Sequence, residues 1–256
     1  MNVRLDKDGA VATLTLDRPE RLNAMSDPMW DALHAHLGAI AADDAIRAVI
    51  LTGAGRAFCS GGDVTGMAKS DIVSGRARSQ RRHRAVMALY SLEKPVIAAV
   101  RGAVYGIGNA LALACDIVVA SETTKFSMAF KKVGVVPDGG AIFFLTQNLG
   151  LARAKDLVYT ARAVPAAEAL ALGLIARVVP DDKLEGAARA LAAEMAESAT
   201  YALALAKKMF HSLYVPTLEQ LLEMETLASG AVRLTHDHQE GVAAFKEKRS
   251  PKFLGK

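Results

Sequence analysis

Two short apolar runs are each followed directly by a glycine-rich segment, and this arrangement constrains the fold more than any other feature of the sequence. Ala48–Leu51 leads into the segment Gly53–Asp63, and Pro95–Val100 leads into Gly102–Asp116. Continuous apolar runs of this length are typical of strands that are buried on both faces of a sheet. Because such parallel strands need long crossover connections, the sequence predicts an α/β core.

Further strand and helix patterns extend this core. Val11–Leu16 alternates small or polar residues with apolar ones, and Ile117–Ala120 is another short apolar run, so both are expected to be strands. Between the strand patterns of Val11–Leu16 and Ala48–Leu51, the sequence Ser26-Asp27-Pro28 is a typical helix start. The helix that follows should pack on the sheet through four apolar residues at helical spacing: Trp30, Leu33, Leu37 and Ile40.

After about Pro180 the pattern becomes helical throughout. Apolar residues keep helical spacing with no strand-like run between them: Leu184, Leu191, Met195, Leu203, Met209, Phe210, Leu221, Leu222 and Leu227. The segment 214–217 is the best break, because Pro216 disfavours helix in the residue before it and Thr217 can cap the next helix. The last third of the chain is therefore predicted to be helical.

Length and composition limit the class of protein. With 256 residues, 52% of them hydrophobic, the chain can form one large domain or two small ones. The first residues lack the apolar region of a signal peptide, and no apolar run approaches the length of a membrane span. Cys59 and Cys115 lack the paired spacing of metal ligands, so buried free thiols are expected. These features predict a cytoplasmic protein without a metal site or a membrane partner.

The densest basic stretch lies between Arg76 and Arg84, where five arginines surround His83. We favour a solvated helix face for this stretch, because charge runs usually form one. A contact with a phosphate group is the second interpretation, and nucleic acid is a distant third. The net charge of +4 suits an anionic ligand without requiring nucleic acid.

The first glycine-rich segment, Gly53–Asp63, contains four glycines that allow backbone N–H groups to approach a ligand closely. It lacks the Lys-Ser/Thr ending of a phosphate-binding P-loop and the glycine spacing of dinucleotide-binding folds. A nucleoside triphosphate or NAD site is therefore disfavoured. A plain glycine-rich turn is the alternative.

The second segment, Gly102–Asp116, resembles a loop that opens into a helix. The N-terminus of a helix offers unpaired N–H donors and a partial positive charge, which suit a developing oxyanion. Close packing of the helix through its small residues is the alternative.

Three motifs resemble the enoyl-CoA hydratase/isomerase (crotonase) family: Ala57–Asp63, Lys94–Val100 with the Gly102 loop, and Ala161–Ala169 running into Gly173–Ile175. The resemblance covers nearly the whole chain. It implies a ββα spiral core over residues 1–196, which binds acyl-CoA, and a C-terminal helical part over 197–256, which packs between the subunits of a homotrimer or hexamer. No permanently bound cofactor is implied, because coenzyme A arrives as part of the thioester substrate.

The resemblance also implies the site. An oxyanion hole would use the backbone N–H groups of Gly62 and Ile107; the second position is often glycine in relatives, so the Ile107 side chain narrows the expected pocket. Coenzyme A would be held by residues of both halves of the chain: Arg21, Ala24, Ser60, Gly61, Asp63, Val64, Phe245 and Lys248. The last two are expected to act from a neighbouring subunit.

The proton-carrying residues distinguish reactions within the family. Hydratase-type members use two glutamates, whose positions match Ala110 and Phe130, and neither residue can carry a proton. Asp138, in a Pro-Asp-Gly sequence, is either a turn or helix-cap residue or, as in the isomerase branch of the family, the proton shuttle. Asp63 and Asp116 are interpreted as residues that organise the backbone.

An enoyl-CoA isomerase is therefore the favoured function. The alternatives are a hydratase with relocated acids, another crotonase reaction on an acyl-CoA, and a non-catalytic member that binds acyl-CoA or RNA. The stretch from Thr65 to Arg84 is expected to line or cover the acyl pocket.

Overall fold

The computed structural model describes residues 2–66, 71–211 and 217–252. Over these residues the chain forms a main sheet with the strand order β1-β2-β3-β4-β6-β9. Its strands are β1 (Val3–Asp8), β2 (Val11–Leu16), β3 (Ala48–Gly53), β4 (Val96–Val100), β6 (Ile117–Ser121) and β9 (Arg177–Val179). β1 pairs with β2 in antiparallel fashion, whereas every later pair in this sheet is parallel. The predicted α/β core is confirmed.

A smaller sheet lies beside the main one and has the order β5-β7-β8. Its strands are β5 (Ala103–Tyr105), β7 (Lys125–Ser127) and β8 (Val164–Pro165). The helices are α1 (Asp27–Ala42), α2 (Ile72–Tyr90), α3 (Ile107–Leu113), α4 (Ala141–Thr160), α5 (Ala166–Leu172), α6 (Leu184–Glu197), α7 (Thr200–His211), α8 (Leu218–Val232) and α9 (His236–Glu247).

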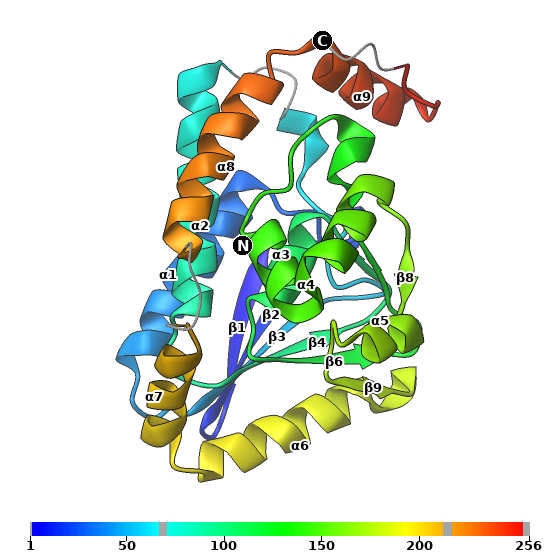
Figure 1. Ribbon diagram of the computed structural model, residues 1–256. Helices are drawn as coiled ribbons and strands as arrows, with labels where there is room; N and C mark the ends of the chain where they lie inside the picture. Colours follow the sequence, from blue (N-terminus) through cyan, green and yellow to red (C-terminus); the bar gives the residue numbers. More distant parts are fainter. Residues whose placement is uncertain (1, 67–70, 212–216, 253–256) are drawn as a thin grey trace.

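Helices cover both faces of the main sheet. Side chains alternate along a strand, so in β3 Val49 and Leu51 enter the core that also contains Trp30 of α1, while Ile50 enters a second core with Leu191 of α6. Figure 1 shows α6 running across the sheet on one side, and α8 running alongside α2. Burial on both faces explains why these strands are continuous apolar runs.

The helix predicted after Ser26 is observed as α1, and its four apolar residues at helical spacing are all buried. The strand predicted over 11–16 matches β2 residue for residue. β1 was not predicted, because its exposed positions carry charged residues that hide the alternation of Val3 and Leu5. It is held as the edge strand of a hairpin with β2, which turns at Gly9 with a positive φ of 57°.

The C-terminal third is helical over its described residues, as predicted. Thr217 caps α8: its side chain accepts a hydrogen bond from the Gln220 N–H, and the Gln220 side chain accepts one from the Thr217 N–H. The rest of the predicted break, residues 214–216, lies outside the described residues. The capping box fixes the start of the helix that lies against α2.

We expect α7 to be buried between subunits of the trimer or hexamer that the sequence resemblance implies, because it leaves large apolar side chains exposed: Tyr201, Leu203, Leu205, Met209 and Phe210. Burial of such a face between subunits removes apolar surface from water. Light scattering should give a mass three or six times the 27.1 kDa of one chain. A solution that holds only the 27.1 kDa species would contradict this expectation.

Candidate active site

The two glycine-rich loops lie side by side. Cys59 forms a parallel bridge with Val104, in which the Cys59 N–H donates to the Ala103 carbonyl oxygen at 3.0 Å and the Tyr105 N–H donates to the Cys59 carbonyl oxygen at 2.9 Å. A Cβ placed on Gly106 would lie 3.9 Å from the Cα of Gly61. A side chain there would be in ordinary van der Waals contact with the first loop, and glycine is favoured because Gly106 has a positive φ of 51°.

The N–H groups of Gly62 and Ile107 are both available to a ligand. Gly62 is the central residue of a parallel bridge with Met25, in which the neighbouring peptide groups make the hydrogen bonds: Met25 N–H to the Gly61 oxygen and Asp63 N–H to the Met25 oxygen. The N–H of Gly62 thus points away from Met25. Ile107 is the first residue of α3, so its N–H has no partner within the helix. Neither N–H finds an acceptor among the described residues.

Close packing explains one glycine at the start of α3. A Cβ on Gly108 would lie 2.5 Å from the carbonyl oxygen of Cys59 and 3.0 Å from its sulfur. The alternative interpretation of this segment, packing through small residues, is therefore correct at Gly108. Packing and the alignment of N–H donors have the same cause, because α3 must touch the first loop to bring Ile107 beside it.

Asp63 and Asp116 organise the backbone, as predicted. Asp63 accepts a hydrogen bond at 2.5 Å from Arg18 and two from Thr65. Burial opposes its ionisation, but the hydrogen bonds from Thr65 and Arg18 outweigh it and lower the Asp63 pKa. Asp116 accepts from the Val96 N–H at 2.7 Å and from Lys207 at 3.0 Å, at the opposite end of the strands.

Asp138 lies directly beside the first turn of α3. Its neighbour Gly139 is so close to this turn that a Cβ would collide with Cδ1 of Ile107 and lie 3.5 Å from Cβ of Ala110. The Asp138 side chain is buried, and its carboxylate lies 3.4 Å from an Arg82 nitrogen. α4 begins after Gly140 without a side-chain cap, so the interpretation of Asp138 as a helix cap is wrong. Only its carbonyl oxygen serves the turn, accepting from the Ala141 N–H.

The interpretation of the basic stretch as a solvated helix face is wrong for two of its residues. Arg82 and His83 are buried, and they face Asp138 together with Glu225 of α8 and Arg233, which follows α8. Burial raises the pKa of Glu225 to about 8, with the charge of Asp138 as the next cause, and burial lowers the pKa of His83 to about 4. We call Asp138, Arg82, His83, Glu225 and Arg233 the buried polar cluster.

The sequence carried one signal for this cluster that we missed. Ser79, Arg82, His83 and Val86 are all buried and recur at the spacing of one helix face. The other arginines of the stretch obscured this pattern, because in the sequence they make the whole stretch resemble a charged surface. In the structure they are more exposed and pair with acids on neighbouring elements, as Arg81 does with Asp31 at 3.0 Å and Arg76 with Glu223 at 2.8 Å. Nothing in the sequence singled out Glu225 or Arg233.

Most of the residues expected to hold coenzyme A lie in two adjoining segments, 21–24 and 60–64, which we call the rim. The Ser60 N–H donates to the Leu22 oxygen at 2.9 Å and its hydroxyl donates to the Arg21 oxygen. Arg18 reaches both the Ala24 oxygen, at 3.3 Å, and Asp63. Six predicted residues lie in these two adjoining segments: Arg21, Ala24, Ser60, Gly61, Asp63 and Val64.

Phe245 and Lys248 lie elsewhere, at the end of α9. This helix packs on the segment Ala129–Val133, where His238 makes a hydrogen bond of 3.0 Å to the Val133 oxygen. Phe245 is exposed, and Lys248 ends the helix. Within one chain the structure does not bring either residue to the rim, so their role stays a prediction about a neighbouring subunit.

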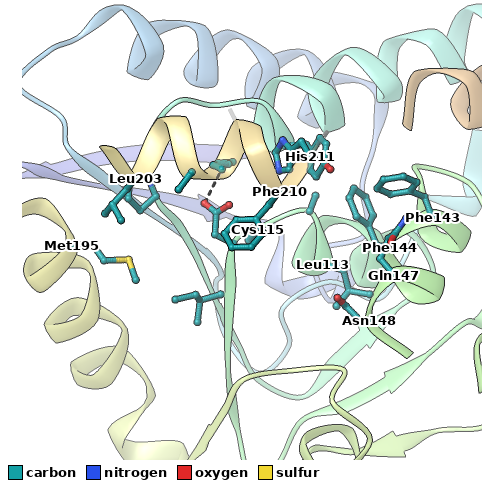
Figure 2. Close-up of a pocket in the computed structure, with 17 residues that line it drawn as sticks. Leu113, Cys115, Phe143, Phe144, Gln147, Asn148, Met195, Leu203, Phe210 and His211 are labelled. Atoms are coloured by element: carbon teal, nitrogen blue, oxygen red, sulfur yellow. Dashed lines mark hydrogen bonds and ion pairs between the residues drawn. The ribbon is translucent and has the colours of Figure 1, made fainter. Parts of the chain in front are cut away.

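A cavity of about 510 Å³ lies away from the candidate site, between α7 and the body of the protein (Figure 2). Its lining is mostly apolar and includes Phe143, Phe144 and Phe210, with the ion pair of Asp116 and Lys207 on its wall. His211 stacks on Tyr90 at a ring distance of 3.6 Å. None of the predicted site residues lines this cavity.

The described part of the chain offers neither a metal site nor a membrane-spanning helix. Within residues 2–66, 71–211 and 217–252, no group of three or more His, Cys, Asp or Glu side chains is placed to hold a metal ion. No helix in the same ranges is long and apolar enough to cross a membrane. Both cysteines are buried free thiols, as predicted, and burial raises the pKa of Cys59 to about 12.

Comparison with known proteins gives a consistent result along the chain. The sequence model of the enoyl-CoA hydratase/isomerase family matches residues 6–256. The chain is 41% identical over 253 residues to 1,2-epoxyphenylacetyl-CoA isomerase of Escherichia coli strain K12, covering 96% of this chain and 95% of the relative. It is 38% identical over 254 residues to a probable enoyl-CoA hydratase of Rhodobacter capsulatus, covering 99% and 98%.

Solved structures agree with the sequence matches. An enoyl-CoA hydratase from Mycobacterium avium subsp. paratuberculosis K-10 superposes with a TM-score of 0.92 and 31% identity, covering 99% of both chains. An alignment over nearly the full length of both chains includes the C-terminal helices as well as the sheet.

Proposed function

The chain belongs to the enoyl-CoA hydratase/isomerase family and has its crotonase fold, and we propose that within this family it is an isomerase that moves the double bond of an enoyl-CoA thioester. That it is an enzyme acting on acyl-CoA follows from the family. One observation carries the finer proposal: Asp138 offers a buried carboxylate beside the first turn of α3, while buried, apolar Ala110 and Phe130 stand at the positions of the hydratase glutamates.

The proposed reaction uses the backbone and one carboxylate. The thioester oxygen accepts hydrogen bonds from the N–H groups of Gly62 and Ile107, each worth roughly 3 kcal/mol in the transition state. Asp138 takes a proton from C2, and the resulting enolate places its charge on that oxygen. The protonated Asp138 then returns the proton to C4, so the double bond moves from C3–C4 to C2–C3. No water is consumed and a single base suffices.

Arg82 positions this base. One of its guanidinium nitrogens donates to the Ser79 hydroxyl oxygen at 2.9 Å and lies 3.4 Å from the Asp138 carboxylate. Both residues that hold the guanidinium are buried. A carboxylate that is held on one side by a fixed guanidinium loses little orientational freedom when the substrate binds.

The main alternative is a hydratase, and the names of similar relatives include hydratases as well as an isomerase. A hydratase needs a second proton-carrying group near the reacting carbons. A member that binds acyl-CoA or RNA without turnover is the remaining alternative; it would not depend on Asp138, and its binding of RNA would weaken steeply with salt.

Incubation with 3-enoyl-CoA, 2-enoyl-CoA and ring-epoxide phenylacetyl-CoA tests the proposal. Products are followed by mass and by the ultraviolet absorbance of the conjugated thioester. An isomerase converts its substrate into a product of the same mass. Turnover of 2-enoyl-CoA alone, with a gain of one water, would favour the hydratase instead.

Coenzyme A itself should bind the free enzyme, because the rim formed by 21–24 and 60–64 matches the place where relatives hold the adenine and pantetheine. Calorimetry with free coenzyme A and with acetyl-CoA should give measurable heat, and both ligands should raise the melting temperature. The absence of heat and of any thermal shift at millimolar ligand would show that the rim has another role.

The proposal also assigns separate roles to two parts of the chain. Residues 1–196 would form the acyl-CoA-binding core, and 197–256 would join the subunits of a trimer or hexamer, where Phe245 and Lys248 reach a neighbouring rim. A reducing compartment such as the cytoplasm suits the two free thiols.

A further inference from the structure

Glu225 is a second carboxyl group beside Asp138. It projects from α8 and is 5% exposed, and its Oε2 accepts a hydrogen bond of 3.1 Å from the N–H of Gly140, two residues after Asp138. The other oxygen, Oε1, is buried and has no hydrogen-bond partner among the described residues. A buried polar atom without a partner is costly, so Oε1 calls for a functional explanation.

The protonation state of Glu225 follows from its surroundings. Burial, and next the charge of Asp138, raise its pKa to about 8, so at neutral pH it mostly holds a proton. Oε2 accepts an N–H, which leaves Oε1 as the oxygen that carries the proton. Glu225 is thus an acid whose O–H is not engaged by any described residue.

His83 lies near Oε2 of Glu225 and is a neutral imidazole whose Nε2 can accept a hydrogen bond. The Thr226 hydroxyl donates to the Leu222 oxygen at 2.9 Å, so its own oxygen accepts from Nδ1–H of His83 at 3.3 Å. Nε2 of His83 is then the unprotonated nitrogen, 3.9 Å from Oε2 of Glu225. Because burial lowers the pKa of His83 to about 4, it does not compete as the acid at neutral pH.

Two carboxyl groups in one buried cluster, one charged and one neutral, can divide the roles of base and acid. We propose that Glu225 is a second proton carrier of the acyl pocket, and that with Asp138 it enables the enzyme to add water across the double bond of 2-enoyl-CoA thioesters. This inference rests on the proposed function, because it takes Asp138 to lie at the reacting carbons. It supplies from α8 the group that Ala110 and Phe130 lack.

Hydration would use both carboxyl groups and return them to their starting states. The carboxylate of Asp138 takes a proton from water while the water oxygen bonds to C3, and the electron pair of the C2–C3 double bond moves into the enolate. The acid form of Glu225 gives its proton to C2, and the thioester carbonyl is restored. The proton on Asp138 then passes to the Glu225 carboxylate, which returns both groups to their starting states.

The test compares two reactions in three proteins: wild type, Glu225→Gln and Glu223→Gln. Glutamine can still accept the Gly140 N–H but cannot donate a carboxylic proton. Glu223, on the same helix, is exposed and pairs with Arg76, which makes it a matched control. Hydration of 2-enoyl-CoA is followed by the gain of one water, and isomerisation of 3-enoyl-CoA by absorbance.

We expect Glu225→Gln to lower hydration by about 100-fold or more and to leave isomerisation within a few-fold of wild type. Glu223→Gln should change neither rate. An equal loss of both reactions would show that Glu225 only holds the loop of Asp138, and unchanged hydration would remove it from the reaction. A wild type that isomerises but never hydrates would overturn this inference while leaving the proposed function intact. If the wild type never isomerises 3-enoyl-CoA and Glu225→Gln loses hydration, the proposed function would be overturned and the role of Glu225 in hydration would be supported.

The pH dependence of the wild type gives a measurement that needs no variant. Hydration should fall as the pH rises through about 8, because the acid form of Glu225 is lost, whereas isomerisation should lack this decline. The charged or titratable groups that face Glu225 are Arg82 and His83 of α2 and Asp138 of the loop. Glu223 of α8 acts on His83, and Arg233, which follows α8, acts on Asp138 and Arg82. A decline shared by both reactions would assign the titration to a group other than Glu225.

Discussion

Asp138→Asn should lower isomerisation by about 100- to 10,000-fold while coenzyme A binds almost as tightly as to the wild type. Asparagine keeps the shape of the side chain and can still face Arg82, but it cannot take up a proton. The rim that is expected to hold coenzyme A lies on other segments, 21–24 and 60–64. Steady-state kinetics with 3-enoyl-CoA and calorimetry with coenzyme A would measure the two effects separately.

A matched control is Asp182→Asn, which makes the same chemical change at an exposed acid that pairs only weakly with Lys183. It should leave both turnover and binding unchanged. Circular dichroism and melting must accompany the kinetics, since Asp138 is buried next to a guanidinium. If folded Asp138→Asn retained most of its turnover, the base would have to be another group of the buried polar cluster.

Gly108→Ala should lower turnover by about 100- to 1000-fold, the usual effect of losing one oxyanion-hole donor. The new Cβ would lie 2.5 Å from the carbonyl oxygen of Cys59, which belongs to the backbone and cannot swing away. α3 must therefore shift relative to the first loop, and Ile107 moves with it. The change in kcat for 3-enoyl-CoA measures this displacement, since Gly108 itself contacts no proposed substrate atom.

Gly186→Ala provides the control for this variant. A Cβ at Gly186 meets nothing within 4 Å, and the residue lies inside α6, so alanine should stabilise the protein by about 0.5–1 kcal/mol without altering turnover. Overpacking at Gly108 costs typically 1–3 kcal/mol, which melting would reveal. Normal kcat in a folded Gly108→Ala protein would mean that the contact between α3 and the first loop does not align the donors.

The fold could be predicted where its information is local. Consecutive residues show helical spacing in α1, alternation in β2, and a continuous apolar run in β3, β4 and β6. The sequence pattern therefore located each of these elements. β5, β7 and β8 are only two or three residues long and are defined by their pairing partners. Strands this short offer too few residues for a burial pattern, so pairing with other segments determines where they begin and end.

The candidate site divides in the same way. Gly62, Ile107 and Asp138 were assigned because their motifs resemble a family, and the structure places the three near one another. Glu225 could not be found in this way, because it reaches Gly140 across 85 positions of sequence from a helix with ordinary amphipathic character. Its burial depends on the packing of α8 against α2, which is a property of the folded chain.

The most direct test of the proposed chemistry is a single turnover of 3-enoyl-CoA with excess enzyme, with the product identified by mass and absorbance. The proposal predicts a conjugated 2-enoyl-CoA of unchanged mass as the first product, formed by the wild type and not by Asp138→Asn. A first product that has gained one water, or the same conjugated product formed at the wild-type rate by Asp138→Asn, would contradict the assignment of Asp138 as the base of an isomerase.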